Sequence, residues 1–227
     1  MSNNPYYTII SGELADSNKI QRDQLAKIPD IIRSSLQAVN KHKERANRIE
    51  FEIIRMDEFL AMIETPQTAL HSILMFASQF RYETYKELGI RAELRLSMGI
   101  GPIEYARKEL RESDGTAFRE AASGLKDMKR NQRLSITTQE ASLNDEFKVS
   151  CGFMDILIHD WSDEQAEALF HCMSGKNQVK ISEELNISQP AVNRRLKAAN
   201  WDATERFIKR YESLIQPRHS QAHDHRK

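Results

Sequence analysis

Residues 49–63 read IEFEIIRMDEFLAMI, two runs of β-branched, aromatic and other apolar residues around a short polar group. The runs are IEFEII and FLAMI, and the group between them is Arg55-Met56-Asp57-Glu58. Strand-like runs joined by so few residues are typical of a β-hairpin. The sequence therefore predicts a hairpin here.

Before the hairpin, the sequence predicts one strand and one helix. The run YYTII at Tyr6–Ile10 is aromatic and β-branched, which is typical of a short buried strand. Between Gln21 and His42 apolar residues recur at helical spacing, and Pro29 breaks or restarts this helix. The apolar stripe consists of Leu25, Ile28, Ile32, Leu36 and Val39.

After the hairpin, helices and strands alternate. Thr65 is the expected N-cap, and Pro66 the first residue, of a long helix that Gly89 closes. The other predicted elements are a half-buried strand over Arg91–Ile100, a helix over Thr116–Arg130 and a strand over Leu134–Thr137. The order is β-α-β-β-α-β and then α-β, so we expect an α+β, ferredoxin-like domain with an extra unit.

The remainder of the chain is predicted to form a second, all-α domain. The segment Thr138–Lys148 is polar and has no strong period, and from Met154 onward the pattern is helical. We expect the α+β domain over residues 1–138, a linker and connecting helix over 139–160, a helix-turn-helix domain over 161–216 and a disordered tail over 217–227.

The helix-turn-helix prediction depends on QVKISEELNISQPAVNRRLKAA, residues 178–199. Ile181 and Leu185 are spaced as neighbours on one helix, and Val192 and Leu196 have the same spacing on the next. The turn Asn186-Ile187-Ser188 lies between them, with Ser188 as the N-cap of the second helix. This arrangement resembles the helix-turn-helix of bacterial regulators and sigma-like proteins.

The second helix carries the side chains that duplex DNA requires. Gln189 and Asn193 are suited to hydrogen bonds with base edges, most naturally adenine, and Arg194 to guanine or phosphate. Phosphate contacts are assigned to Ser188, Arg195 and Lys197. Between residues 188 and 200 there are three basic residues and no acidic one. The alternative is a plain helical hairpin used for packing or dimerisation.

Composition excludes several other classes of protein. Lys+Arg and Asp+Glu both number 33, so no overall charge attracts the chain to nucleic acid or lipid. The longest apolar run, Ile73–Ala77, is too short for a membrane helix, and we find no secretory signal. Two cysteines cannot form a disulfide framework. We expect a cytoplasmic protein with no membrane partner.

Two acidic residues of the predicted α+β domain form a candidate metal site. Glu13 follows the first predicted strand and Asp57 lies in the hairpin turn, so a ferredoxin-like sheet would bring them together. A divalent cation such as Mg²⁺ or Mn²⁺ would relieve their repulsion. Asp16 and Glu58 could join them. The alternative is that these acids are ordinary solvated surface residues.

Between about Tyr6 and Thr137 the chain resembles the SatD family. The segments that carry this resemblance are Gly12-Glu13-Leu14 with Ser17, Met56-Asp57-Glu58-Phe59-Leu60, Gly99-Ile100-Gly101 and Asp114-Gly115-Thr116-Ala117-Phe118. Members of that family often carry a C-terminal helix-turn-helix. The same order of elements is similar, more distantly, to the palm domains of nucleotide cyclases and diguanylate cyclases.

The palm resemblance implies that Glu13 and Asp57 are metal ligands and that Gly12, Ser17 and Glu58 contact a nucleotide. The chain departs from the cyclase hairpin G-G-D-E-F, because Arg55 and Met56 replace glycines that let a triphosphate approach the backbone. We therefore assign no catalytic residue. We expect a regulator of transcription that binds duplex DNA, with a palm domain that senses a nucleotide or forms a homodimer. The alternative is a metal-dependent, cyclase-like enzyme that carries a DNA-binding domain.

Overall fold

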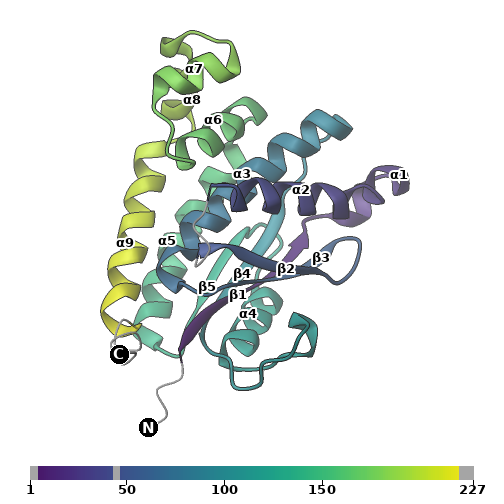
Figure 1. Ribbon diagram of the computed structural model, residues 1–227, viewed down its shortest axis with the longest axis vertical. Coiled ribbons are helices and arrows are strands. Elements are labelled where there is room, and N and C mark those ends of the chain that lie inside the picture. Colours follow the sequence, from purple (N-terminus) through teal and green to yellow (C-terminus); the bar gives the residue numbers. More distant parts are fainter. Residues whose placement is uncertain (1–4, 43–46, 220–227) are drawn as a thin grey trace.

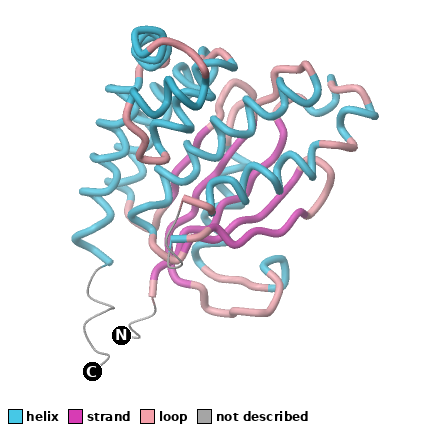
Figure 2. The backbone as a smooth tube through the Cα atoms, turned by 45° about the horizontal axis from the view of Figure 1, so that its top comes forward, coloured by secondary structure: helices cyan, strands magenta, loops and turns pink. Residues whose placement is uncertain are grey.

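The computed structural model describes residues 5–42 and 47–219. Within them, one sheet contains, in spatial order, β2 (Ile49–Ile53), β3 (Glu58–Ile63), β1 (Tyr6–Leu14), β4 (Leu94–Pro102) and β5 (Leu134–Thr137). Neighbours among the first four strands pair antiparallel, and β5 pairs with β4 in parallel. Figure 2 shows this twisted sheet in magenta.

Helices pack on both faces of the sheet, because successive residues of a strand point to opposite sides. Ile10 of β1 belongs to a large core that includes α2 (Ile28–Asn40) and α3 (Ala69–Leu88). The neighbouring Ile9 packs instead with α4 (Thr116–Asp127). In Figure 1, α2 and α3 lie above the sheet and α4 lies below it.

The approach of α4 to the sheet depends on a glycine. A Cβ atom at Gly99 of β4 would lie 2.1 Å from the carbonyl oxygen of Ala117 and 2.2 Å from the amide nitrogen of Ala121. Both atoms belong to the backbone of α4, so a side chain at this position would push the whole helix away from the sheet.

The ferredoxin-like order of elements is confirmed, and α4 with β5 forms the extra unit. The first strand is longer than predicted, since β1 continues to Leu14 instead of ending at Ile10. It is the central strand and pairs with both β3 and β4, so even its polar end has hydrogen-bonding partners. Glu13 therefore lies inside the strand and not beyond its end, which corrects its expected place.

The predicted helix boundaries are confirmed where they depend on local turn chemistry. Gly89 has a left-handed φ of 64° and ends α3, and Pro29 lies in the first turn of α2 after the short α1 (Arg22–Leu25). Thr65 does not cap α3, however. Residues Pro66–Thr68 form a 3₁₀ turn, and α3 begins after it.

The second half of the chain is helical. Its helices are α5 (Ala141–Asp160), α6 (Asp163–Met173), α7 (Gln178–Leu185), α8 (Gln189–Ala198) and α9 (Trp201–His219). Figure 1 shows α7 and α8 at the end of the molecule away from α4. Of the tail predicted over 217–227, residues 217–219 continue α9, and 220–227 lie outside the described residues. None of the described helices is both long enough and apolar enough to cross a lipid bilayer.

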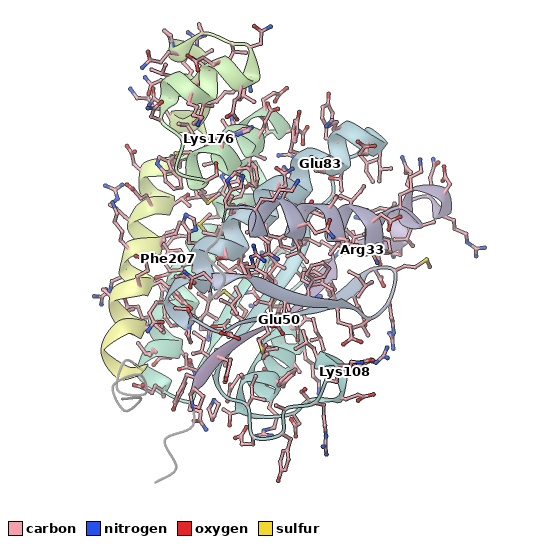
Figure 3. The ribbon with its side chains drawn as sticks, in the orientation of Figure 1. Arg33, Glu50, Glu83, Lys108, Lys176 and Phe207 are labelled. Carbon is pink, nitrogen blue, oxygen red and sulfur yellow. The ribbon has the colours of Figure 1, made fainter. Side chains whose placement is uncertain are left out.

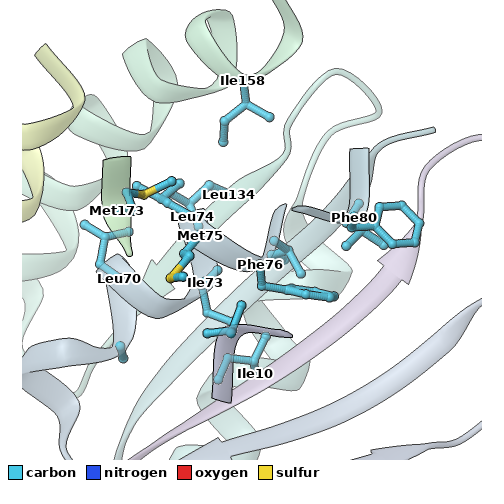
Figure 4. Packing of buried hydrophobic residues seen from close by; sticks show 14 of the residues in the cluster. Ile10, Leu70, Ile73, Leu74, Met75, Phe76, Phe80, Leu134, Ile158 and Met173 are labelled. Carbon is cyan, nitrogen blue, oxygen red and sulfur yellow. The ribbon is translucent and has the colours of Figure 1, made fainter. Parts of the chain in front are cut away.

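The hydrophobic core continues from the sheet into these helices. Figure 4 shows Met173 of α6 and Ile158 of α5 in the same cluster as Leu74 of α3 and Leu134 of β5. Trp161 is buried, and its indole Nε1 donates to the carbonyl oxygen of Ala199 at 3.1 Å. One continuous core thus contains residues from both sides of position 138, where the sequence predicts a domain boundary.

Candidate functional site

Of the two acids predicted to bind a metal, Glu13 lies on β1 and Asp57 lies in the turn just before the neighbouring strand β3. Glu13 faces Glu58 across the β1–β3 pair and Arg95 across the β1–β4 pair. Asp57 lies in the hairpin turn, and its carbonyl oxygen accepts a hydrogen bond of 2.8 Å from the amide of Leu14. The end of β1 and the hairpin turn are therefore close together, as the sequence predicts.

The carboxylate of Glu13 forms an ion pair with Arg95. The Arg95 guanidinium is held in place from a second direction, because its Nη2 donates to the carbonyl oxygen of Met128 at 2.6 Å. Both side chains are largely shielded from solvent, with 19% of Arg95 and 29% of Glu13 exposed. A fixed cation of the protein thus neutralises the acid on β1.

The other nearby acids are also engaged by basic side chains. Asp16 pairs with Lys19 at 3.0 Å and with Arg130 at 2.8 Å. Hydrogen bonds from Lys19 and then from Arg130 lower the pKa of Asp16. Glu58 pairs with Arg55 at 3.2 Å.

This arrangement does not fit Mg²⁺ or Mn²⁺. Such a cation needs several free oxygen ligands, and Arg95 already occupies the carboxylate of Glu13. No group of three or more His, Cys, Asp or Glu side chains with the geometry for a metal ion occurs in the described part of the chain. Of the predicted metal pair, Glu13 is thus engaged by Arg95, and metal binding by Glu13 and Asp57 stays a prediction.

The structure gives the predicted nucleotide-binding residues other roles. A Cβ atom at Gly12 would lie 2.2 Å from the ring of Phe59, which fills that space in the core. Ser17 begins a 3₁₀ turn that follows Asp16, whose φ of 52° is left-handed. Gly12 is therefore required for packing, and contact of Gly12, Ser17 or Glu58 with a nucleotide stays a prediction.

Sequence reasoning missed Arg95. The alternation of Leu94 and Leu96 predicts a half-buried strand and so places Arg95 on the opposite face. A cation in a strand that pairs on both sides is a signal for a buried partner, because an unpaired charge there would be costly. The partner itself becomes evident only when the register aligns Arg95 with Glu13.

The second candidate surface is formed by α7 and α8. Asn186 has a left-handed φ of 52° and ends α7, and the side chain of Ser188 accepts a hydrogen bond of 3.3 Å from the amide of Ala191. The predicted three-residue turn and the predicted cap are both present. Val192 and Leu196 point into the core.

The outward residues of α8 are polar and basic. Ser188, Gln189, Arg194 and Lys197 are exposed, and Asn193 is half-buried. Because residues four apart lie on one face of a helix, Gln189, Asn193 and Lys197 form a row along α8. Four of the six predicted DNA-binding residues are therefore exposed at this surface, and Asn193 and Arg195 are half-buried.

Arg195 differs from the other predicted DNA contacts. Its Nη1 donates to the Glu167 carboxylate of α6 at 3.1 Å, and only 25% of the side chain is exposed. Glu167 also accepts a hydrogen bond from Tyr82 of α3, which, with burial, raises the pKa of Tyr82 to about 12. Arg195 is thus held within the chain by an acid two helices earlier in the sequence, a partner that the local pattern does not reveal.

No family of proteins and no curated protein matches the sequence. Several solved structures are similar in fold. The guanylyl cyclase Cya2 is 13% identical with a TM-score of 0.45, covering 63% of this chain and 79% of that chain. A monomeric guanylyl cyclase domain from the fungus Blastocladiella emersonii is 14% identical with a TM-score of 0.44, covering 65% and 86%.

A diguanylate cyclase domain from Vibrio cholerae, described as an active GGEEF domain, is 16% identical with a TM-score of 0.39, covering 60% of this chain and 85% of that chain. These three neighbours are nucleotide cyclase domains. The likeness concerns the fold alone.

We expect the Glu13–Arg95 pair to stabilise the fold without a metal. Arg95→Met should lower the free energy of unfolding by about 1–3 kcal/mol, because it leaves a shielded carboxylate unpaired. Glu13→Gln with Arg95→Met should recover part of the loss, and Arg55→Met, at an exposed ion pair, should cost less than about 1 kcal/mol. Urea unfolding measures these values.

Because Arg95 already neutralises Glu13, we expect Mn²⁺ to leave the melting temperature of the wild-type protein unchanged. A rise in melting temperature with Mn²⁺ that disappears in Asp57→Asn would contradict this expectation, since a ligand of the native state stabilises it.

Proposed function

We propose that this protein binds duplex DNA through the outward face of α8 and regulates transcription from the cytoplasm. The observation that carries the proposal is the pairing of a capped three-residue turn with a polar, basic outer face on the second helix. Helix-turn-helix proteins place such a second helix in the major groove, where its first residues contact base edges.

Each accessible residue of α8 has a role in this proposal. Gln189 and Asn193, near the beginning of the helix, contact base edges, for which amide side chains offer a donor and an acceptor. Arg194 contacts guanine or phosphate. Lys197 and the Ser188 hydroxyl bind phosphate and fix the orientation of the helix on the duplex.

The α6 helix supports α8 in this arrangement. Its Glu167 holds the Arg195 guanidinium at 3.1 Å. In the free protein this ion pair orients α8, and the guanidinium is not available to bind a phosphate of DNA. This revises the role that the sequence pattern assigns to Arg195. For the α+β part we propose a palm of the SatD type that senses a nucleotide or contributes to a homodimer.

DNA binding by the full chain can be measured by fluorescence anisotropy at several salt concentrations. Lys197→Ala should weaken binding to all duplexes. It should also lower by about one the number of counterions released on binding, which is measured as the slope of log K against log salt concentration. Asn193→Ala should instead reduce discrimination at one base pair by about 1–3 kcal/mol.

The matched control is Lys108→Ala. Lys108 is an exposed lysine in the loop before α4, and Figure 3 shows it at the opposite end of the molecule from Lys176, which precedes α7. This variant should bind DNA as the wild type does. Equal losses in Lys108→Ala and Lys197→Ala, or binding that does not depend on salt, would exclude α8 as the DNA-binding surface.

A second prediction concerns the ion pair behind α8. Glu167→Gln removes the charge that holds Arg195 and makes its guanidinium available to a phosphate. We expect tighter binding to all duplexes, with about one more counterion released on binding. If Glu167→Gln together with Arg195→Ala showed the same increase, Arg195 would not be its cause.

The second candidate function is a metal-dependent, cyclase-like nucleotidyl transfer. The backbone hydrogen bond that joins the end of β1, where Glu13 lies, to Asp57 in the hairpin turn favours it, and the ion pair of Glu13 with Arg95 opposes it. Because Arg95 occupies the carboxylate of Glu13, we expect no cyclic nucleotide or dinucleotide from ATP or GTP with Mn²⁺. Chromatography of a long incubation tests this. A product that is lost in Asp57→Asn would establish the enzyme instead.

A further inference from the structure

One face of α5 presents a row of large apolar side chains to solvent. Val149 is 63% exposed, Phe153 is 69% exposed and Ile156 is 58% exposed. Their spacing of four and then three residues places them on one side of the helix. Contiguous exposed apolar surface of this kind marks an interaction site.

The helix cannot turn to bury this row, because its opposite face is already packed. Phe147, Cys151 and Met154 are buried in the main core. Asp155 accepts hydrogen bonds of 2.7 Å and 2.9 Å from the amides of Arg133 and Leu134, which fix α5 against β5. The apolar row is therefore a permanent feature of the surface.

A glycine lies in the middle of the row. Gly152 is exposed, and a Cβ atom built on it would meet no atom of the described chain within 4 Å. A glycine in a helix interior costs about 1 kcal/mol relative to alanine, and nothing within the described chain requires one here. A second helix that crosses closely at this point would require it.

Beside the row there is a groove of 490 Å³ between α5 and the segment before β5. Its lining includes Gly152, Ile156 and Asp160 on the side of α5 and Lys129, Gln132 and Arg133 on the other, so charged side chains rim the apolar part. An aromatic side chain that enters from a neighbouring helix over Gly152 would occupy part of this groove. Phe153 of a second copy is such a side chain.

The charges at the two ends of the row complement each other. Lys148 flanks the N-terminal end and Asp160 flanks the C-terminal end, and both are exposed. Neither forms an ion pair within the described residues. If a second α5 lies antiparallel, Lys148 of each copy approaches Asp160 of the other. A parallel helix would place like charges together.

We propose that the protein forms a two-fold symmetric dimer in which the α5 rows of two copies pack antiparallel. The helices cross between Gly152 and Phe153, each Phe153 enters the groove of the other copy, and at both ends the long Lys148 side chain reaches along the helix to Asp160 of the other copy. Such an interface is self-complementary, as a two-fold axis demands. The proposal is independent of whether α8 binds DNA.

Sedimentation equilibrium of the full chain over a wide range of concentrations tests the dimer. Wild type should dimerise, and Phe153→Glu should weaken the dimer by about 100-fold or more, as expected for a residue at the centre of an interface. Met56→Glu is the matched control, because Met56 is 54% exposed on the hairpin and should have no effect. A monomeric wild type, or a Phe153→Glu variant that dimerises like it, would overturn the proposal.

Charge reversal provides a second test that does not depend on the apolar row. Lys148→Asp and Asp160→Lys should each weaken the dimer, and the two together should restore it. These residues lie at opposite ends of the row, too far apart to pair within one copy, so restoration requires contact between copies. Additive weakening in the double variant would exclude the antiparallel register.

Discussion

The buried guanidinium of Arg81 joins the two halves of this molecule. Arg81 lies on α3, is only 2% exposed and donates to the carbonyl oxygens of Ile158 at 2.8 Å and His159 at 3.3 Å, at the C-terminal end of α5. It also pairs with Glu93 at 3.3 Å. A buried charge is tolerable only when partners surround it, so the positions of α3, α5 and the start of β4 are fixed together.

Glu93 is the acid on which this junction depends. Burial opposes its ionisation, but the hydrogen bond and charge of Arg133, together with the charge of Arg81, outweigh burial and lower its pKa. Since its folded pKa lies below the unfolded value, Glu93 stabilises the fold above the unfolded pKa, and this contribution is lost as the pH falls through the folded pKa. The junction is therefore strongest near neutral pH.

From this junction the chain positions α8. The C-terminal end of α5 leads directly to Trp161, whose indole holds Ala199 at the end of α8. Glu167 of α6 holds Arg195 of α8 and accepts a hydrogen bond from Tyr82 of α3. The proposed DNA-binding face is thus presented by a helix attached to the α+β part through one core and several polar contacts, not by a flexibly tethered module.

Much of the fold follows from local sequence patterns. The hairpin around Asp57, the end of α3 at Gly89 and the turn before Ser188 are each determined by residues within a few positions, and all are present. The site is less predictable because its chemistry depends on pairs distant in sequence. Arg95 neutralises Glu13 through strand register, and Glu167 holds Arg195 through helix packing. The apolar periodicity that predicts elements does not encode either pair.

The central claim is that α8, and not the strand ends around Glu13, is the ligand-binding surface. Backbone amide spectra of the full chain, recorded with a duplex DNA and separately with GTP and Mg²⁺, test it most directly. We predict that DNA shifts the amide signals of Gln189, Asn193 and their neighbours on α8 and leaves the hairpin unchanged. Shifts at residues 54–58 with GTP and Mg²⁺, without any response of α8 to DNA, would contradict it.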